Sequence, residues 1–339
     1  MKVVITGGAG FIGSNAASRY LRRGDEVVVM DDLSRAGASH NLDWLKRQGR
    51  LTFLKVDVRD SRKVGRAFEV HSDAGLVLHL ASQVAVALSV KDPRTDFDVN
   101  ALGTFNVLEA ARLAGITALL IYSSTNKVYG GMEDVAVEER DGRYAYKDLP
   151  DGIPEERPLD FHTPYGCSKG AADQYVRDYA RIYGLRTVVF RQSCVYGDRQ
   201  FGVEEQGWVA WFMIATQLGL PLTVYGDGKQ VRDVLFIEDL LNAFDAALGN
   251  IQTAAGRVYN IGGGPDNVLS IRDLLTYLER QEGRPVPYRQ EGWRPGDQKV
   301  YVSDIRRAQL ELGWTPLISQ VQGLDHLYKW VWSHRDLYR

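Results

Sequence analysis

A short apolar run at the start of the chain leads directly into regularly spaced glycines. Residues 3–6 read Val-Val-Ile-Thr, and Gly7, Gly10 and Gly13 follow before an amphipathic stretch over 14–23. Glycines at this spacing permit a tight turn, a close backbone approach to a pyrophosphate and a helix whose first N–H groups face the anion. The pattern therefore predicts a strand–turn–helix unit that binds a dinucleotide, and Phe11 and Ile12 of the same turn belong to the predicted site.

An acidic pair ends the next predicted strand, residues 26–31. Asp31 and Asp32 stand about twenty residues beyond the glycines, where a carboxylate accepts hydrogen bonds from the adenosine ribose and repels a 2′-phosphate. This position favours NAD over NADP, and Ser34 is included in the site. Arg35 leaves NADP as an alternative cofactor, because its guanidinium would contact a 2′-phosphate if Asp31 turned away. The remaining alternative is a glycine turn that binds no cofactor.

The first half of the chain alternates short β-branched runs with helical patterns. Strands are predicted at residues 3–6, 26–31, 51–56, 76–80, 118–123 and 187–191. This alternation predicts an α/β fold with a doubly wound parallel sheet of the Rossmann type. Residues 131–158 carry many charges, prolines and glycines, which predicts a long surface excursion.

Beyond Tyr196 the regular alternation fades into helical stretches at 206–218, 237–249, 270–281 and 304–312, separated by turns. We expect residues 1–190 to form the cofactor-binding domain, with 232–256 returning to it. Residues 191–231 and 257–339 are then expected to form a smaller, interleaved substrate-binding domain.

Composition excludes several classes of partner. The 41 basic and 43 acidic residues give a net charge of −2, so nothing indicates binding to nucleic acid or to an anionic membrane surface. No apolar run has the length of a signal peptide or a membrane span, which predicts a cytoplasmic protein. Cys167 and Cys194 are too few for a disulfide framework, and no cluster has the spacing of a metal site, so we predict no metal.

A tyrosine and a lysine four residues apart are the main catalytic candidates. On a helix, Tyr165 and Lys169 lie on one face. A pair of this kind is often only a surface pair, but here a cationic Lys169 and nicotinamide ring would favour the tyrosinate, which takes a proton from a substrate hydroxyl. The strand at 118–123 runs into Ser123, Ser124 and Thr125, at the strand end where ligands bind in open α/β sheets. Thr125 is therefore expected to reach the reacting hydroxyl, whereas Ser123 also fits a simple turn residue.

Together these motifs, with residues 57–59, 79–81 and 128–130, resemble the extended short-chain dehydrogenase/reductase family over nearly the whole chain. The resemblance implies that Thr125 and Tyr165 handle the hydroxyl, that Lys169 binds the nicotinamide ribose and that Asn100 orders the active-site helix. It also implies a homodimer formed through residues 100–113 and 169–182. Along the cofactor the resemblance places Asp57, Val58, Leu80, Ala81, Gln83, Asn100, Ser123 and Gln192. Gln192 departs from the Tyr, Leu or His common in the family.

The residues after Thr125 bear on the reaction. Related 4,6-dehydratases carry an Asp-Glu pair there, an acid and a base for removing water, whereas this chain has Asn126 and Lys127. Epimerisation is therefore favoured, since it needs only transient oxidation by NAD. The strings at 123–130, 160–175, 199–201 and 206–208 are similar to the CDP-tyvelose (CDP-paratose) 2-epimerases of this family. That similarity implies a CDP-sugar, CDP-paratose or CDP-glucose, inverted at C2.

Family positions supply the expected substrate contacts. Arg232 and Arg294 match positions that face the pyrophosphate, which guanidinium groups bind bidentately. Gln206 and Trp208 are candidates for the base, although Trp208 also suits a buried helix face. The full predicted set is Ser124, Thr125, Asn126, Arg199, Gln206, Trp208, Arg232 and Arg294. The alternatives are a UDP-hexose 4-epimerase and a non-catalytic NAD-binding scaffold, against which Tyr165 and Lys169 argue.

Overall fold

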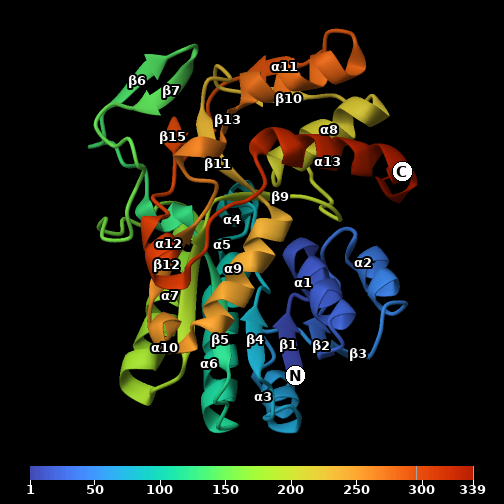
Figure 1. Cartoon of the computed structure of the whole chain (residues 1–339), viewed down its shortest axis with the longest axis vertical. Coiled ribbons are helices and arrows are strands. Elements are labelled where there is room, and N and C mark those ends of the chain that lie inside the picture. Colours follow the sequence, from blue (N-terminus) through green and yellow to red (C-terminus); the bar gives the residue numbers. More distant parts are fainter. Residues whose placement is uncertain (295, 339) are drawn as a thin grey trace.

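Seven parallel strands form the central sheet (Figure 1). The computed structural model describes residues 1–294 and 296–338. The sheet order is β12-β8-β5-β4-β1-β2-β3, and every neighbouring pair is parallel. The strands are β1 (Lys2–Thr6), β2 (Glu26–Asp31), β3 (Leu51–Lys55), β4 (Leu76–His79), β5 (Leu119–Thr125), β8 (Thr187–Gln192) and β12 (Val258–Ile261). The predicted Rossmann-type sheet is therefore confirmed.

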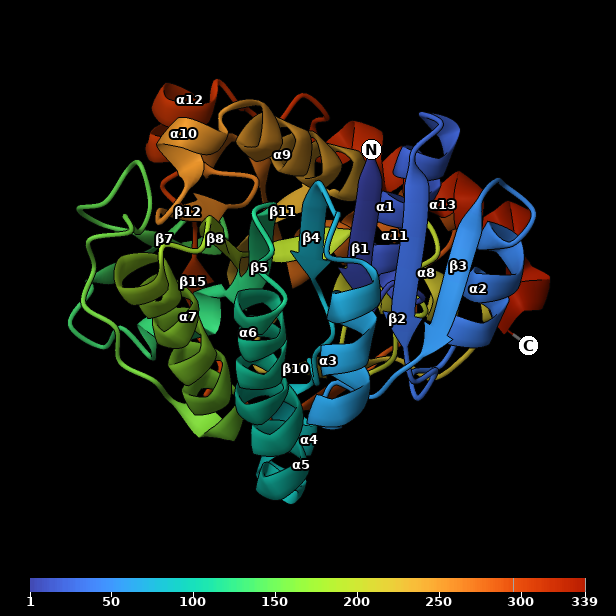
Figure 2. The same ribbon diagram turned by 90° about the horizontal axis from the view of Figure 1, so that it is seen from below.

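Helices cover both faces of this sheet (Figure 2). Alternate residues of a strand point to opposite faces, so Val3 and Ile5 pack in one hydrophobic core and Val4 in another. The first core is shared with α1 (Phe11–Arg22), α2 (Ala38–Leu45), α9 (Ile237–Gly249), α10 (Ile251–Ala254) and α12 (Arg306–Leu312). The opposite face carries α3 (Ser61–Val70), α6 (Gly103–Leu113) and α7 (Thr163–Tyr183). This double coverage explains why the central strands read as continuous apolar runs.

Between β4 and α6 the chain forms two short helices and a π-helical turn. These are α4 (Val86–Lys91), α5 (Pro93–Phe97) and η1 (Asp98–Leu102). The 3₁₀ turn η2 (Asn126–Tyr129) follows β5 directly. Within the predicted excursion, β6 (Val137–Arg140) and β7 (Arg143–Tyr146) pair as an antiparallel hairpin.

A smaller assembly lies beyond the carboxyl ends of the sheet strands, in the upper part of Figure 1. One sheet joins β13 (Val268–Ser270), β11 (Val231–Phe236) and β15 (Val300–Tyr301), with β9 (Cys194–Tyr196) beside β11. A second pair joins β10 (Thr223–Tyr225) and β14 (Arg289–Glu291). The helices here are α8 (Trp208–Leu218), α11 (Ile271–Glu282) and α13 (Gln320–Ser333), with the 3₁₀ turns η3 (Pro265–Asn267) and η4 (Arg335–Tyr338).

The expected domain boundaries need one correction. Strand β12 was assigned to the substrate part, yet Val258 pairs with Val189 and completes the central sheet. Strand β11 was assigned to the cofactor part, yet it lies in the smaller sheet. The segment that returns to the Rossmann part is therefore 237–261 and not 232–256. Strand pairing decides to which sheet a strand belongs, and the sequence of β12 does not reveal its partner strand. The division into two functional domains remains a proposal.

No helix in residues 1–294 or 296–338 is both long and apolar enough to cross a bilayer. The cytoplasmic location stays a prediction. Within the same residues, no group of three or more His, Cys, Asp or Glu side chains has a metal-binding arrangement.

Candidate active site

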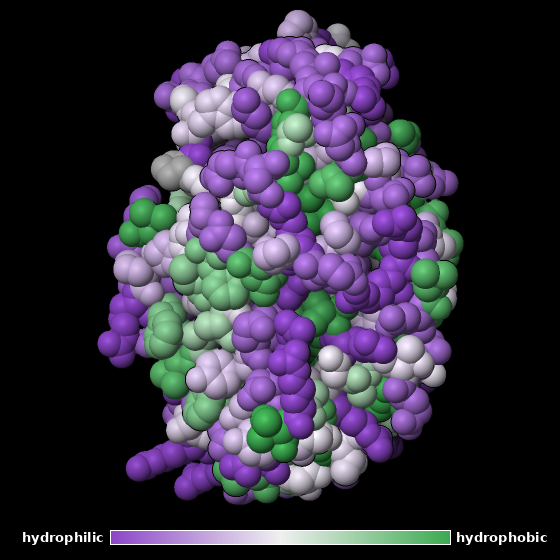
Figure 3. Space-filling model, turned by 90° about the vertical axis from the view of Figure 1, so that its left-hand side faces the viewer, coloured by the Kyte–Doolittle hydropathy of each residue, from purple (hydrophilic) through white to green (hydrophobic). Residues whose placement is uncertain are grey.

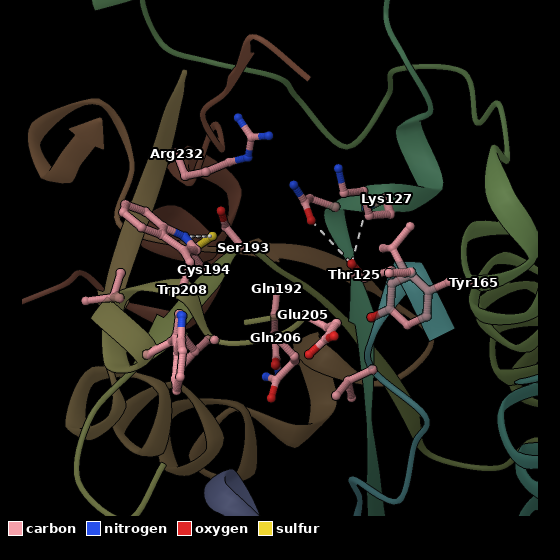
Figure 4. A pocket seen from close by; sticks show the side chains of 18 of the residues that line it. Thr125, Lys127, Tyr165, Gln192, Ser193, Cys194, Glu205, Gln206, Trp208 and Arg232 are labelled. Atoms are coloured by element: carbon pink, nitrogen blue, oxygen red, sulfur yellow. Dashed lines mark hydrogen bonds between the residues drawn. The ribbon is translucent and has the colours of Figure 1, made fainter. Parts of the chain in front are cut away.

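A cavity of about 670 Å³ opens between the carboxyl ends of β5 and β8 and the smaller assembly (Figure 4). In open parallel sheets this edge is where ligands bind. The lining includes fourteen of the predicted site residues: Phe11, Ile12, Leu80, Ser123, Ser124, Thr125, Asn126, Tyr165, Lys169, Gln192, Gln206, Trp208, Arg232 and Arg294. Two buried donors of the lining, Gln192 Nε2 and Trp211 Nε1, have no hydrogen-bond partner among the described residues.

The glycine turn lies beside this cavity and leaves no room for larger residues. Gly7 has a φ of +67°, and a Cβ there would stand 2.6 Å from the Ala81 nitrogen. A Cβ on Gly13 would stand 2.2 Å from the Gly7 oxygen. The turn therefore keeps the bare backbone at the start of α1, after Gly10, that a pyrophosphate requires. These residues fit a dinucleotide.

The acidic pair after β2 is tied to its own surroundings. Asp31 accepts hydrogen bonds from the backbone N–H of Ala9 at 2.9 Å and of Leu33 at 2.8 Å, and burial raises its pKa. Asp32 accepts from the N–H and the hydroxyl of Ser34 at 2.9 and 2.7 Å. Asp31 thus braces the glycine turn, and its carboxylate retains lone pairs for a ribose.

Arg35 forms its hydrogen bond with a residue distant in sequence. Its guanidinium donates to Gln206 Oε1 at 3.0 Å. Gln206 belongs to the loop before α8, so the contact joins the segment after β2 to the smaller assembly. In this arrangement the guanidinium of Arg35 is held by Gln206.

Two of the predicted catalytic residues, Thr125 and Tyr165, meet at one side of the cavity (Figure 4). Tyr165 comes from the first turn of α7, and Thr125 from the end of β5. Burial raises the pKa of Tyr165 to about 12. The hydrogen bond with Thr125 acts in the opposite direction and lowers this pKa. The amine of Lys169 donates to the Ser123 oxygen and lies 4.4 Å from the centre of the Tyr122 ring. Burial lowers the pKa of Lys169 to about 7.

These pKa values refine the expected role of the lysine. The tyrosinate of Tyr165 was expected to be favoured by Lys169 together with a cationic nicotinamide ring. In the protein alone, burial raises the pKa of Tyr165 and so acts in the opposite direction. A bound oxidised nicotinamide ring would supply positive charge in the cavity.

Buried polar contacts fix the start of α7. Asn100, on the π-helical turn, donates to Ser168 Oγ at 3.1 Å and to the Gln83 oxygen at 3.0 Å. The Tyr165 N–H donates to Ser89 Oγ at 3.1 Å. Asn100 thus holds the helix segment that carries Tyr165 and Lys169, the two predicted catalytic side chains of α7, and π-turns of this kind are frequent at functional sites.

The opposite wall is polar and basic. Arg232 donates to Asp297 Oδ1 at 2.6 Å. The guanidinium of Arg294 lies 3.7 Å from the centre of the Tyr225 ring. Trp208 donates from Nε1 to the sulfur of Cys194 at 3.4 Å. Five basic and three acidic residues line the described cavity, so it is more basic than the chain as a whole.

The other predicted residues lie outside the cavity lining: Gly7, Gly10, Gly13, Asp31, Asp32, Ser34, Arg35, Asp57, Val58, Ala81, Gln83, Asn100 and Arg199. Asp57 forms an ion pair with Arg59 at 2.6 Å, which lowers its pKa. Arg199 lies over Trp44, 3.5 Å from the ring centre, and so packs on the surface of α2 instead of facing the cavity.

Comparison with known proteins identifies the lineage. Residues 3–262 match the NAD dependent epimerase/dehydratase family. The chain belongs to this family. It is 44% identical over 338 residues to the CDP-paratose 2-epimerase of Salmonella typhi, covering 98% of this chain and all of the relative. It is 33% identical to the UDP-glucose 4-epimerase of Mycolicibacterium smegmatis, covering 96% of both.

A solved structure agrees with the fold. The Thermus thermophilus UDP-glucose 4-epimerase in complex with NAD superposes with a TM-score of 0.81, at 32% identity, over 98% of this chain and all of that one. Family membership confirms the predicted family, NAD as cofactor, and the class of NAD-dependent nucleotide-sugar epimerase.

Sequence reasoning missed several lining residues of this family member. Lys127 was weighed only as the replacement of a dehydratase carboxylate, although its place directly after Thr125 was a usable signal. Cys194, Tyr225 and Asp297 also line the cavity. Cys194 stands two residues after Gln192 and Asp297 three residues after Arg294, so nearness to a predicted site residue was a usable signal for both.

Proposed function

We propose that this epimerase inverts C2 of a CDP-hexose. The substrate is CDP-paratose, giving CDP-tyvelose, or CDP-glucose, giving CDP-mannose. The observation that carries the proposal is the 44% identity, over essentially its full length, to a CDP-paratose 2-epimerase.

The residues beside Thr125 support epimerisation over dehydration. Loss of water needs an acid for the leaving hydroxyl and a base for the neighbouring C–H. This chain offers an amide, Asn126, and an amine, Lys127, at the positions where the dehydratases carry carboxylates. Transient oxidation needs no such pair.

The roles of the catalytic side chains follow from their places in the cavity. Bound NAD supplies an acceptor that takes hydride from C2 and returns it. Tyr165 takes the proton of the C2 hydroxyl and later gives it back, and Thr125 orients that hydroxyl. Lys169 holds the nicotinamide ribose. A cavity of about 670 Å³ leaves room for the keto sugar to present its other face while the walls limit access of water.

Binding roles are proposed for the surrounding residues. The glycine turn and Asp31 hold the two ends of the dinucleotide's adenosine diphosphate part, with Asp57 and Val58 beside the adenine. Arg232 and Arg294 bind the substrate diphosphate, and Trp208 and Gln206 form the wall for the base. The free Nε2 of Gln192 is a donor to the sugar or to the nicotinamide amide.

A UDP-hexose 4-epimerase is the second candidate, favoured by the similarity to enzymes of that name. Both reactions use a threonine, a tyrosine and a lysine, and they differ in the carbon that meets the nicotinamide. Purified protein is therefore incubated separately with CDP-paratose, CDP-glucose, UDP-glucose and UDP-galactose, and the products are identified by NMR. Inversion at C2 of the CDP-sugars supports the proposal, and inversion at C4 of the UDP-sugars overturns it.

The hydride route has its own test. A hydride held on reduced nicotinamide does not exchange with water, so the epimer formed in deuterium oxide keeps its original C2 hydrogen. Mass spectrometry and NMR of the first turnovers measure this. Substantial deuterium at C2 would eliminate the shuttle in favour of proton exchange.

We also propose a homodimer through α6 and α7. Large hydrophobic side chains are exposed along these helices, among them Phe105, Leu113, Tyr175, Ile182 and Tyr183. Figure 3, which faces the left-hand side of Figure 1, shows hydrophobic side chains exposed among polar ones on that side of the molecule. An exposed apolar area of this kind is typical of a protein interface.

Light scattering tests the dimer with a matched pair of variants. Ile182→Glu places a charge in the proposed interface and should yield monomers. Leu310→Glu alters an 86% exposed leucine on α12 and should leave the dimer intact. A monomeric wild type at working concentration contradicts the proposal.

A further inference from the structure

Lys127 stands where the catalytic strand meets the basic wall of the cavity. Its backbone N–H donates to Thr125 Oγ1 at 3.2 Å. Its amine donates to the Gly296 oxygen and to Gln298 Oε1, each at 3.3 Å. Both acceptors are neutral, and no carboxylate in the described residues forms an ion pair with it. Figure 4 shows Lys127 at the same end of the cavity as Arg232.

The charge of this amine is poorly compensated. The carboxylate whose charge acts on it is Asp297, which is already engaged with Arg232 at 2.6 Å. Burial, followed by the charge of Arg232, lowers the pKa of Lys127 to about 8. A half-buried ammonium without a counter-ion costs free energy unless an anionic ligand offsets it. A perturbed amine in a cleft is therefore a candidate ligand-binding group.

We propose that Lys127 binds the sugar-linked phosphate of the substrate and thereby places C2 of the sugar ring beside Thr125 and Tyr165. The inference rests on the proposed 2-epimerase function and names a specificity-determining residue for it.

The connectivity of a nucleotide sugar explains why a cation belongs here. The diphosphate is attached through the oxygen on C1, and C2 is the adjacent carbon. When C2 lies at Thr125, the sugar-linked phosphate must lie close to the same residue. C4 is on the far side of the ring, so an enzyme that reacts there keeps the phosphate away from its catalytic threonine.

The position of Lys127 fits the first arrangement. Its backbone contacts the catalytic threonine, while its side chain reaches residues 296 and 298 on either side of Asp297, the partner of Arg232. Arg232 and Arg294 remain for the nucleoside-linked phosphate. The three cations thus form a row of phosphate-binding groups from the reacting carbon toward the base. A carboxylate at position 127 would repel the diphosphate.

Nucleotides that differ by one phosphate test this assignment. Binding of CDP and CMP to the NAD-loaded protein is measured by calorimetry for the wild type and for Lys127→Met. We expect CDP to bind about 10- to 100-fold more weakly to the variant, because a charge-assisted hydrogen bond is lost. CMP binding should stay within about twofold, since CMP lacks the second phosphate.

Two further variants serve as controls. Lys147→Met removes an exposed lysine that is not among the described residues of the cavity lining, and should leave CDP and CMP binding unchanged. Lys127→Arg keeps the charge and should recover most of the CDP affinity. Thermal melting of each variant verifies folding, and Lys127→Gln replaces Lys127→Met if the methionine variant melts early.

Each outcome has a defined meaning. Unchanged CDP binding in Lys127→Met overturns the proposal, and so does an equal loss for CDP and CMP, which would indicate a structural role. If the CDP-selective loss occurs but the wild type does not invert C2, the phosphate contact holds and the proposed function fails. If the wild type inverts C2 and Lys127→Met binds CDP normally, the function holds and Lys127 has no such role.

Discussion

The cofactor half and the substrate half of this site are built in different ways. The glycine turn of the cofactor half lies on one strand–turn–helix unit, and Asp31 braces it by accepting a hydrogen bond from the Ala9 N–H. The substrate half gathers Lys127, Arg232 and Arg294 from separate segments of the chain. Local geometry thus determines the first and long-range packing the second. The difference implies that substitutions in one half should leave the other half working, and the following experiments test that separation.

Tyr165→Phe, at the junction of the two halves, should have the largest effect. The variant loses the proton acceptor and little volume, so turnover should fall about 10³-fold or more while bound NAD is retained. Product formation and nucleotide content are measured on the same preparation. Tyr288→Phe, at an exposed position outside the cavity lining and the proposed dimer interface, is the control and should be silent. A Tyr165→Phe enzyme with most of its activity would refute the assigned role.

Gly13→Ala should damage the cofactor half. The new Cβ would overlap the Gly7 oxygen at 2.2 Å, so we expect loss of bound NAD and about 1–3 kcal/mol of stability. Gly65→Ala in α3 meets no atom within 4 Å and should retain NAD. Denaturant unfolding and nucleotide content report both effects. Normal NAD content in Gly13→Ala would contradict the close packing of the turn.

Arg294→Met should damage only the substrate half. Loss of one phosphate contact raises KM about 10- to 30-fold while NAD content stays at the wild-type level. Arg289→Met, on exposed β14, is the matched control. Steady-state kinetics on the preferred nucleotide sugar give the result. Loss of NAD from Arg294→Met would mean that the two halves are not independent.

The smallest expected effect is the pH dependence of CDP binding. The pKa of Lys127 is lowered to about 8, and phosphate binding needs the protonated amine. The contribution is therefore complete well below pH 8 and is lost as the pH rises through that value, by up to about 10-fold at pH 9. The charged or titratable groups facing this amine are Arg232, Asp297 and Cys194, and burial raises the pKa of the Cys194 thiol.

A subtraction isolates the lysine from other groups. CMP binding is measured over the same pH range. It gives the part of the pH dependence of nucleotide affinity that does not involve the second phosphate. The CDP-minus-CMP difference should flatten in Lys127→Met. A difference that persists in the variant would assign the titration to another group.

Much of the central fold was predictable from short-range patterns. The first six predicted strands correspond to β1–β5 and β8, with ends shifted by no more than two residues. Strand β12 was missed, because Val-Tyr-Asn-Ile is too short a run to indicate its partner. The hairpin of β6 and β7 lies in a segment whose charges and glycines predicted only a loop.

The sequence by itself determined the parts of this protein that depend on neighbouring residues. Turn chemistry needs glycine at positions 7 and 13, and helical periodicity places Tyr165 and Lys169 on one face, so both features are readable without coordinates. Tertiary structure alone decided that Arg35 contacts Gln206 and that Arg199 packs on Trp44. It also decided that Lys127 reaches residues 296 and 298. The physical reason is that these contacts join segments far apart in the chain, whose meeting depends on how the whole sheet and its smaller partner pack together.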